Sequence, residues 1–229
     1  MIICPRGKDH DQGAEFVCGV GGNRKLWEGV EVTAVENDAV VVDIYQKLYP
    51  NDRVIYGDAS KVLLDEYENF DFIWASPPCQ SHSKARWAIA ANSKRLRPVY
   101  PDMTLWKMII FLQHHCDNYW CVENVQPYYD PLIMPTAKLH RHWFWANYWI
   151  PEFRDHPARP NISQINVGEL QRVHGIDLQQ YSIPGKDRRR QLLRNCVWPP
   201  LGNHVFIHAP LAENKGKNQN TQRPLFPMS

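Results

Sequence analysis

A buried strand and its abrupt end are encoded together in residues 70–81, which read Phe70-Asp71-Phe72-Ile73-Trp74-Ala75-Ser76-Pro77-Pro78-Cys79-Gln80-Ser81. The apolar run predicts a strand, and the two prolines that follow cannot continue a sheet ladder. In an α/β sheet, the loop after the carboxyl end of a strand is where sites are usually built. Cys79 is therefore a candidate nucleophile, although a free cysteine is also a common small filler of apolar cores.

Apolar strand-like runs alternate with helical patterns on both sides of this stretch. Strands are predicted at 30–35, 53–56, 70–75 and 119–122, with helices at 39–48, 60–68 and 104–115. This β-α-β-α rhythm predicts an α/β fold with a mostly parallel sheet and helices on both faces. After Pro127 the rhythm loosens, leaving a strand-like aromatic run at 143–150 and helices at 168–174 and near 200–209.

Composition narrows the class of protein. A chain of 229 residues forms one good-sized domain, and a net charge of +2 means that any nucleic-acid surface must come from clustered cations. The six cysteines are irregularly spaced, so we expect no disulfide framework, and no second ligand pair joins Cys116 and Cys121 to make a metal site. Without a signal segment or a long apolar run, a soluble, cytoplasmic protein is expected. We also expect a monomer.

Three short segments predict a pocket for a cofactor that carries adenosine. Cys18-Gly19-Val20-Gly21-Gly22 is a glycine-rich loop through which a backbone can approach a ligand closely, although a plain turn would look the same. Glu36 ends the next strand, where an acid can accept hydrogen bonds from ribose hydroxyls. Asp58 follows the third strand and can accept from an adenine amino group. No P-loop lysine accompanies the loop, which argues against a nucleoside triphosphate.

A second acid lies beside the candidate nucleophile. Cys79 follows one predicted strand and Glu123 ends the next, with a single helix between them. A right-handed crossover makes these strands parallel, so both side chains emerge at the same edge of the sheet. A thiol beside a carboxylic acid suits covalent attack on a ring whose nitrogen is protonated or hydrogen-bonded at the same time.

The ordered set of motifs resembles the DNA (cytosine-5)-methyltransferase family, and most of all its compact phage and prophage members. The resemblance covers roughly residues 15–210, and it rests on Gly19/Gly21-Gly22, Glu36, Asp58, Pro78-Cys79-Gln80, Glu123-Asn124-Val125 and Arg194-Asn195-Cys196-Val197. It implies a Rossmann-like fold, S-adenosylmethionine as methyl donor, and a cytosine flipped out of double-stranded DNA. Cys79 would attack C6, Glu123 would hold N3 and the amino group, and the methyl group would pass to C5.

The resemblance also implies roles for further residues. Arg141 matches the arginine segment that contacts the cytosine O2, but the family has two arginines at alternate positions and His140-Arg141-His142 has one, so an exposed cation is the alternative. The first strand departs from the family because Gly7 to Glu15 is polar; the strand is then either very short or begins in the run Met1 to Cys4. The implied cofactor-binding residues are Cys18, Gly19, Gly21, Gly22, Glu36, Asn37, Asp58, Ala59, Pro77, Asn195 and Val197.

A basic stretch follows the nucleophile and predicts contact with nucleic acid. No acid interrupts residues 80–98, so this stretch can meet phosphates, while the polar residues after Cys79 can fill the gap that a flipped base leaves. A solvated basic loop is the alternative. The predicted nucleic-acid-binding residues are Gln80, Ser81, His82, Ser83, Lys84, Arg86, Arg95 and Arg97.

The predicted organisation leaves little chain for reading a target sequence. We assign 1–149 to catalysis and cofactor binding, 150–168 to a minimal target-recognition segment, 169–211 to returning C-terminal motifs, and 212–229 to a disordered tail. So short a segment predicts a short or relaxed sequence context. The alternatives are an RNA (tRNA) cytosine-5 methyltransferase and a nucleic-acid-binding relative without turnover. A phage-encoded enzyme acting in a bacterial host, for example in protection from restriction, fits the resemblance.

Overall fold

The centre of the protein is a seven-stranded sheet within the residues that the structure describes. The structure is a computed structural model that describes residues 11–16, 18–92, 97–155 and 165–211. The strands are β1 (Asp11–Phe16), β2 (Val30–Glu36), β3 (Arg53–Tyr56), β4 (Phe72–Ala75), β5 (Tyr119–Val125), β6 (Ala137–Leu139) and β7 (His142–Ala146). Their order is β3-β2-β1-β4-β5-β7-β6.

The five strands β1 to β5 run parallel, whereas β7 pairs antiparallel with both β5 and β6. The order β3-β2-β1-β4-β5 is that of a doubly wound Rossmann-type sheet, so the predicted α/β fold is confirmed. The strand order reverses between β1 and β4. Ligands of such sheets bind outside the carboxyl ends of the strands at this reversal point.

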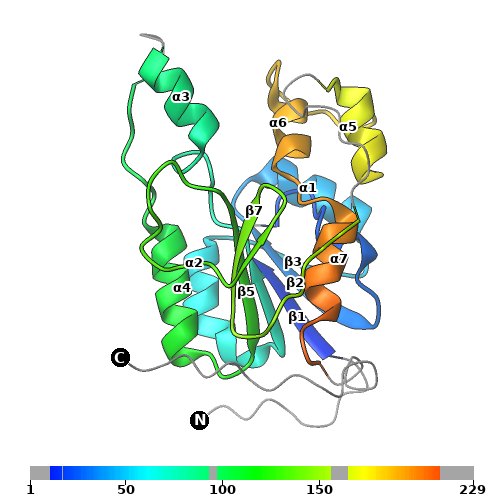
Figure 1. Ribbon diagram of the computed structural model, residues 1–229. Coiled ribbons are helices and arrows are strands. Elements are labelled where there is room, and N and C mark those ends of the chain that lie inside the picture. Colours follow the sequence, from blue (N-terminus) through cyan, green and yellow to red (C-terminus); the bar gives the residue numbers. More distant parts are fainter. Residues whose placement is uncertain (1–10, 17, 93–96, 156–164, 212–229) are drawn as a thin grey trace.

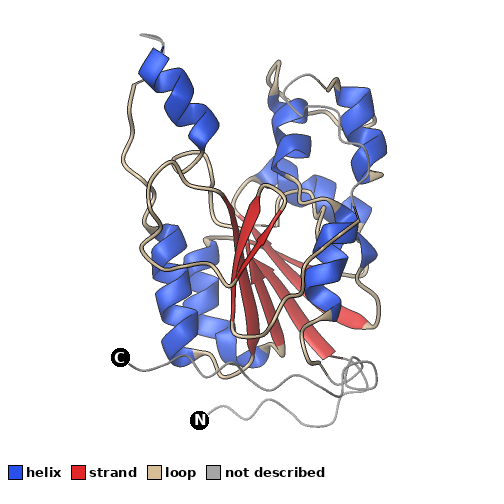
Figure 2. Cartoon of the chain, in the orientation of Figure 1, coloured by secondary structure: helices blue, strands red, loops and turns tan. Residues whose placement is uncertain are grey.

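Helices cover both faces of the sheet (Figures 1 and 2). The α-helices are α1 (Ala39–Leu48), α2 (Ala59–Glu66), α3 (Lys84–Asn92), α4 (Thr104–His115), α5 (Val167–His174), α6 (Arg188–Asn195) and α7 (Pro199–Ile207), and two short 3-10 helices are η1 (Arg24–Leu26) and η2 (Tyr67–Asn69). Apolar side chains of α2 and α4 pack on one face and those of α7 on the other. Figure 1 shows α3 rising at one side of the sheet edge and α5 with α6 at the other.

Strand β4 shows why the apolar run near Cys79 is a strand. Phe72 and Trp74 join the core under α7, while Ile73 and Ala75 join the core under α2 and α4. All four side chains are completely buried, as expected for a central parallel strand covered on both faces. The strand ends at Ala75, and Ser76, Pro77 and Pro78 begin the loop that carries Cys79.

The structure corrects the prediction for the first strand. β1 is not very short, because residues 11–16 form it in register with β2 and β4. The run Met1 to Cys4 lies outside the described residues. Gly13 and Ala14 are buried there, and a Cβ on Gly13 would lie 3.0 Å from Val30 Cγ2. A small residue is therefore needed where neighbouring strands press close. Packing against the neighbouring strands, rather than an apolar pattern in its own residues, therefore makes this segment a strand.

Other elements fall close to their predicted bounds. α1, α4 and β3 have the predicted bounds, and α5 and α7 begin one residue earlier than expected. α3 was predicted as part of a basic loop; it buries no side chain, so no apolar periodicity marks it. The predicted tail 212–229 lies outside the described residues. Within the described part of the chain, no helix is long and apolar enough to cross a membrane.

Candidate active site

Loops from four adjacent parallel strands meet at one edge of the sheet, on either side of the reversal point. Cys18 and Gly19 follow β1, Glu36 ends β2, Asp58 follows β3, and Pro77 follows β4. Because these strands are parallel, all of these residues lie at the carboxyl edge. The predicted cofactor-binding residues of these loops are therefore brought to one edge by the sheet itself.

Glu36 ties the first of these loops together. Its Oε2 accepts a hydrogen bond from Gly19 N at 3.1 Å, and its Oε1 accepts from Asn37 N at 2.9 Å and Asp38 N at 3.2 Å. The carboxyl group is buried, and burial raises its pKa while the three N–H groups oppose that rise. Gly57 N also donates to Glu36 O at 3.0 Å, which links the loops after β2 and β3. Glu36 thus fixes the shape of this part of the edge.

The glycine loop leaves room for a ligand at one position and none at the others. Gly19 has φ 54°, and nothing lies within 4 Å of where its Cβ would stand. A Cβ on Gly21 would lie 2.5 Å from Tyr49, and one on Gly22 would lie 2.7 Å from Val197 O. The loop backbone is therefore accessible at Gly19, whereas Gly21 and Gly22 are closely packed against other residues. This arrangement fits the close approach of an adenosine-bearing methyl donor.

The remaining predicted cofactor residues divide into accessible and buried groups. Asn37 and Asp58 are exposed, and Asp58 Oδ1 caps α2 by accepting from Ser60 N at 2.8 Å. Ala59, the first residue of α2, is buried in the core, and Cys18 is buried in the loop after β1. Asn195 is exposed at the end of α6, whereas the buried Val197 reaches the glycine loop through its backbone, as the Gly22 contact shows. The accessible carboxylate of Asp58 suits ligand binding, and the buried groups shape the pocket from behind.

The loop that carries Cys79 is held by its neighbour β5. Asn124 Nδ2 donates to Pro77 O at 2.9 Å, and this side chain is buried. On the other side of the thiol, the amides of His82 and Ser83 both donate to Cys79 O at 3.1 Å. The backbone around Cys79 is therefore fixed from both directions. Asn124 was quoted in the motif but not predicted to position the nucleophile; its place directly after Glu123 was the signal.

Cys79, Glu123 and Arg141, the three predicted catalytic residues, act on one another electrostatically. The pKa of the Cys79 thiol is raised from an ordinary value near 9 to about 11, mainly by burial and further by the negative charge of Glu123, while Arg141 opposes both. Burial also lowers the pKa of Arg141, against the charges of Glu123 and Cys79. Arg141 is only partly exposed, in the turn before β7. The resting thiol is protonated at neutral pH, so attack must be coupled to loss of its proton.

This electrostatic group predicts a shifted alkylation profile. Iodoacetamide modification of Cys79, followed on its peptide by mass spectrometry, is expected to rise with a midpoint at about pH 11 rather than near 9. Arg141→Gln should move the midpoint higher, because Arg141 lowers the thiol pKa. A midpoint near 9 in the unchanged protein would show that the thiol is solvated and lacks this environment.

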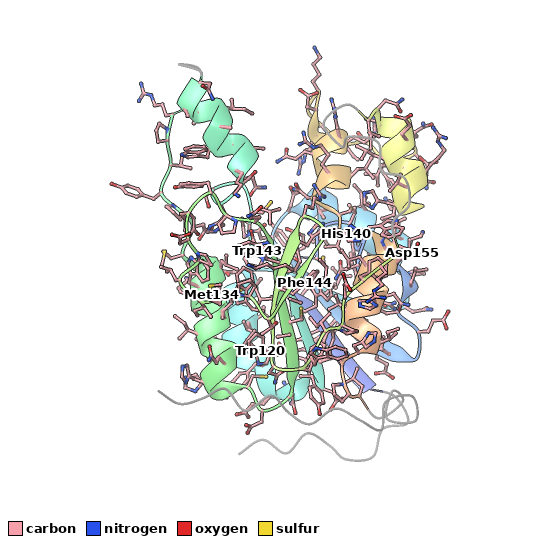
Figure 3. All side chains as sticks on the ribbon, viewed as in Figure 1. Trp120, Met134, His140, Trp143, Phe144 and Asp155 are labelled. Atoms are coloured by element: carbon pink, nitrogen blue, oxygen red, sulfur yellow. The ribbon has the colours of Figure 1, made fainter. Side chains whose placement is uncertain are left out.

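A hairpin from β6 to β7 carries Arg141 to the site. His140 occupies its turn with φ 57°, and Figure 3 shows it at the end of the hairpin, with Phe144 and Trp143 along β7. Arg141 Nη2 donates to Arg194 O at 2.8 Å, so the last turn of α6 braces this arginine. Sequence reasoning missed His142, whose Nδ1 lies 2.5 Å from Glu123 Oε1. Its signal was the departure from the two-arginine pattern.

The predicted nucleic-acid residues are mostly accessible, with one correction. Gln80, Lys84 and Arg97 are exposed, and Ser81, Ser83 and Arg86 are partly exposed; Arg95 lies outside the described residues. His82 is completely buried, with Nδ1 2.5 Å from Tyr129 Oη, so it cannot fill the gap left by a flipped base. It anchors the start of the loop instead. Within the described residues, no group of three or more His, Cys, Asp or Glu could hold a metal ion.

Comparison with known families bears directly on this site. A family model described as C-5 cytosine-specific DNA methylase matches residues 12–131, more than half of the 229-residue chain. The match includes the glycine loop, Glu36, Cys79 and Glu123, and it ends before Arg141 and the C-terminal helices. No curated protein matches the chain.

Solved structures are similar only in part. The DNMT2 mutant of Spodoptera frugiperda is 21% identical, with a TM-score of 0.36 over 50% of this chain and 35% of that one. A prophage-encoded DNA modification methyltransferase of E. coli is 18% identical, with a TM-score of 0.32 over 52% of this chain and 33% of that one. The plantazolicin methyltransferase BamL, solved with SAH, is 16% identical, with a TM-score of 0.31 over 50% and 38%. The chain therefore spans about a third of the length of these neighbours.

Proposed function

The chain belongs to the family of C-5 cytosine-specific DNA methylases, and on that premise we propose that it methylates C5 of a cytosine flipped out of double-stranded DNA. The observation that carries the proposal is the group of Cys79, Glu123 and Arg141, in which the charges of Glu123 and Arg141 act on the thiol, and those of Glu123 and Cys79 act on Arg141. The bare backbone at Gly19 and the anchored carboxylate of Glu36 support S-adenosylmethionine as the donor. When bound, this cofactor would supply a methyl group attached to a positively charged sulfur, which makes the methyl carbon open to nucleophilic attack.

In the proposed reaction, Cys79 loses its thiol proton and its sulfur forms a bond to C6 of the cytosine. Glu123 hydrogen-bonds or protonates N3 in the same step, which stabilises the charge that builds on the ring. C5 then becomes nucleophilic and accepts the methyl group. Loss of the C5 proton and cleavage of the C6–sulfur bond restore the ring and release Cys79. Arg141, beside both residues, contacts the cytosine O2.

The basic segment after Cys79 is the proposed grip on the DNA backbone. α3 begins at Lys84 and carries Arg86, and in Figure 1 it stands clear of the sheet beside the site. Lys84 and Arg97 are exposed, as phosphate contacts require. Gln80, Ser81 and Ser83 lie nearest the nucleophile along the chain and are the proposed residues for the gap left by the base.

A covalent trap tests the proposed function. A duplex with 5-fluorocytosine at the target position cannot lose fluorine as a proton is lost, so a working enzyme stalls as an adduct through Cys79. We expect a complex that survives denaturing electrophoresis with the DNA duplex and requires S-adenosylmethionine. The same trap is tested with an RNA duplex that contains 5-fluorocytosine. An adduct with this RNA duplex alone would overturn DNA as the substrate in favour of RNA. No adduct with either would overturn catalysis and favour a binding protein without turnover.

The proposal includes a short or relaxed target context. Residues 150–168 are the proposed recognition segment, and each good base contact supplies about 1–3 kcal/mol of discrimination. Bisulfite sequencing of random-sequence DNA treated with the protein should show methylation at many sequence contexts. A strict site of about four or more base pairs would contradict this prediction, because it needs more base contacts than this segment can supply.

A further inference from the structure

His142 joins the two charged residues that surround the nucleophile. It is the first residue of β7 and pairs with Val125 at the end of β5, so its ring lies beside Glu123. His142 Nδ1 is 2.5 Å from Glu123 Oε1, and Arg141 Nε is 3.1 Å from His142 Nε2. The side chains of His142 and Glu123 are 4% and 8% exposed, so water does not compete for these bonds. A continuous chain therefore runs from Arg141 through His142 to Glu123.

The directions of these two bonds follow from the donors available. A guanidinium has no acceptor, so Arg141 Nε–H donates and His142 Nε2 accepts. The proton of the neutral ring is then on Nδ1, which donates to Glu123 Oε1. His142 is thus a neutral bridge between a cation and an acid. Glu123 Oε2 accepts no hydrogen bond from the residues that the structure describes, which leaves it available to a base.

We propose that His142 is a positioning residue for the attack on cytosine, a role that rests on the proposed function. Its Nδ1–H holds Glu123 Oε1, and this fixes the rotation of the carboxyl group so that Oε2 faces N3 of the flipped base. Its Nε2 holds Arg141 beside Cys79. Preorganised groups of this kind need no rearrangement when the reaction begins, so their main effect is on the rate of attack.

Three substitutions at one position separate the two bonds of His142. Asn places an amide where Nδ1 stands and can still donate to Glu123, Gln places its amide where Nε2 stands and faces Arg141, and Phe keeps the ring shape but makes neither bond. His114→Phe is the matched control, because His114 is exposed near the end of α4. Each variant is first checked for retained S-adenosylmethionine and duplex affinity, which shows that it folds.

The single-turnover rate of adduct formation with the 5-fluorocytosine duplex is the main measurement. We expect His142→Phe to slow it by about 10- to 100-fold at saturating DNA, as loss of a hydrogen bond to a charged group implies. His142→Asn should recover most of that loss, His142→Gln should recover less, and His114→Phe should match the unchanged protein. Equal rates for Phe and the unchanged protein, or an Asn variant as slow as Phe, would overturn the proposal.

A measurement on the free protein keeps this inference separate from the proposed function. Long-range ¹H–¹⁵N NMR is expected to show the His142 ring neutral with its proton on Nδ1, and Glu123→Gln should move that proton signal upfield. A proton on Nε2, or a signal unaffected by Glu123→Gln, would overturn the bridge whether or not the protein is active. Failure of the unchanged protein to form any adduct, with the NMR result as expected, would instead overturn the proposed function.

Discussion

Cys79→Ser is expected to abolish the covalent adduct and to lower methyl transfer by about four orders of magnitude or more, as loss of an enzyme's nucleophile does. The hydroxyl of serine is a far weaker nucleophile than a thiolate at neutral pH, and no other described side chain at this site can replace it. The loop should keep its shape, because the bonds that hold it involve the backbone of Pro77 and Cys79. Affinity for S-adenosylmethionine should therefore be nearly unchanged. Two measurements check this prediction. One is adduct formation with the 5-fluorocytosine duplex, and the other is transfer of labelled methyl groups to DNA that is retained on a filter.

Cys116→Ser is the matched control for this experiment. Burial raises the pKa of Cys116 to about 11, as for Cys79, but this thiol follows α4 at the opposite edge of the sheet from the site. Its Sγ donates to Asn118 O at 3.7 Å, a bond that serine can also make. The control should react like the unchanged protein. Equal loss in both variants would mean that a buried thiol matters only for folding, and a reactive Cys79→Ser protein would rule out Cys79 as the nucleophile.

The parts of the site that lie in local sequence patterns were predictable. β4 and β5 are apolar runs with an intervening helix, and parallel pairing alone places Cys79 and Glu123 at the same edge. Glu36 was predictable for the same reason, since it is the last residue of β2. These predictions need only the β-α-β rhythm and the handedness of its crossovers.

The parts that depend on contacts between distant segments were not predictable. β1 is polar in sequence and becomes a central strand because β2 and β4 flank it, and α3 has no apolar face to reveal it. His82 looked like a polar loop residue, yet it is buried against Tyr129. His142 reaches Glu123 through the antiparallel register of β7 on β5, which no local pattern encodes. In each case the deciding partner is far away in sequence.

Glu123→Gln is expected to ease ionisation of the Cys79 thiol and yet to slow its attack on cytosine. Glu123 is one of the causes that raise the thiol pKa, so removal of its charge should lower the midpoint of Cys79 alkylation below about 11. Adduct formation should nevertheless slow by about three orders of magnitude, because an amide cannot protonate N3 as the ring accepts the sulfur. If Glu123 acted only by its charge on the thiol, the Glu123→Gln variant would form the adduct faster than the unchanged protein.

The glutamine variant suits this test because it keeps the surrounding bonds. Its Oε1 can still accept from His142 Nδ1, so the bridge to Arg141 is retained and the buried site is not left with an unpaired donor. S-adenosylmethionine affinity and melting temperature should stay close to those of the unchanged protein. Faster alkylation together with slower adduct formation would separate the two roles of Glu123, whereas an adduct rate equal to that of the unchanged protein would rule out proton transfer from this residue. Such opposite responses would mean that Cys79 loses its proton only when the base arrives and Glu123 binds N3. The thiol would then not stand as a thiolate in the empty site.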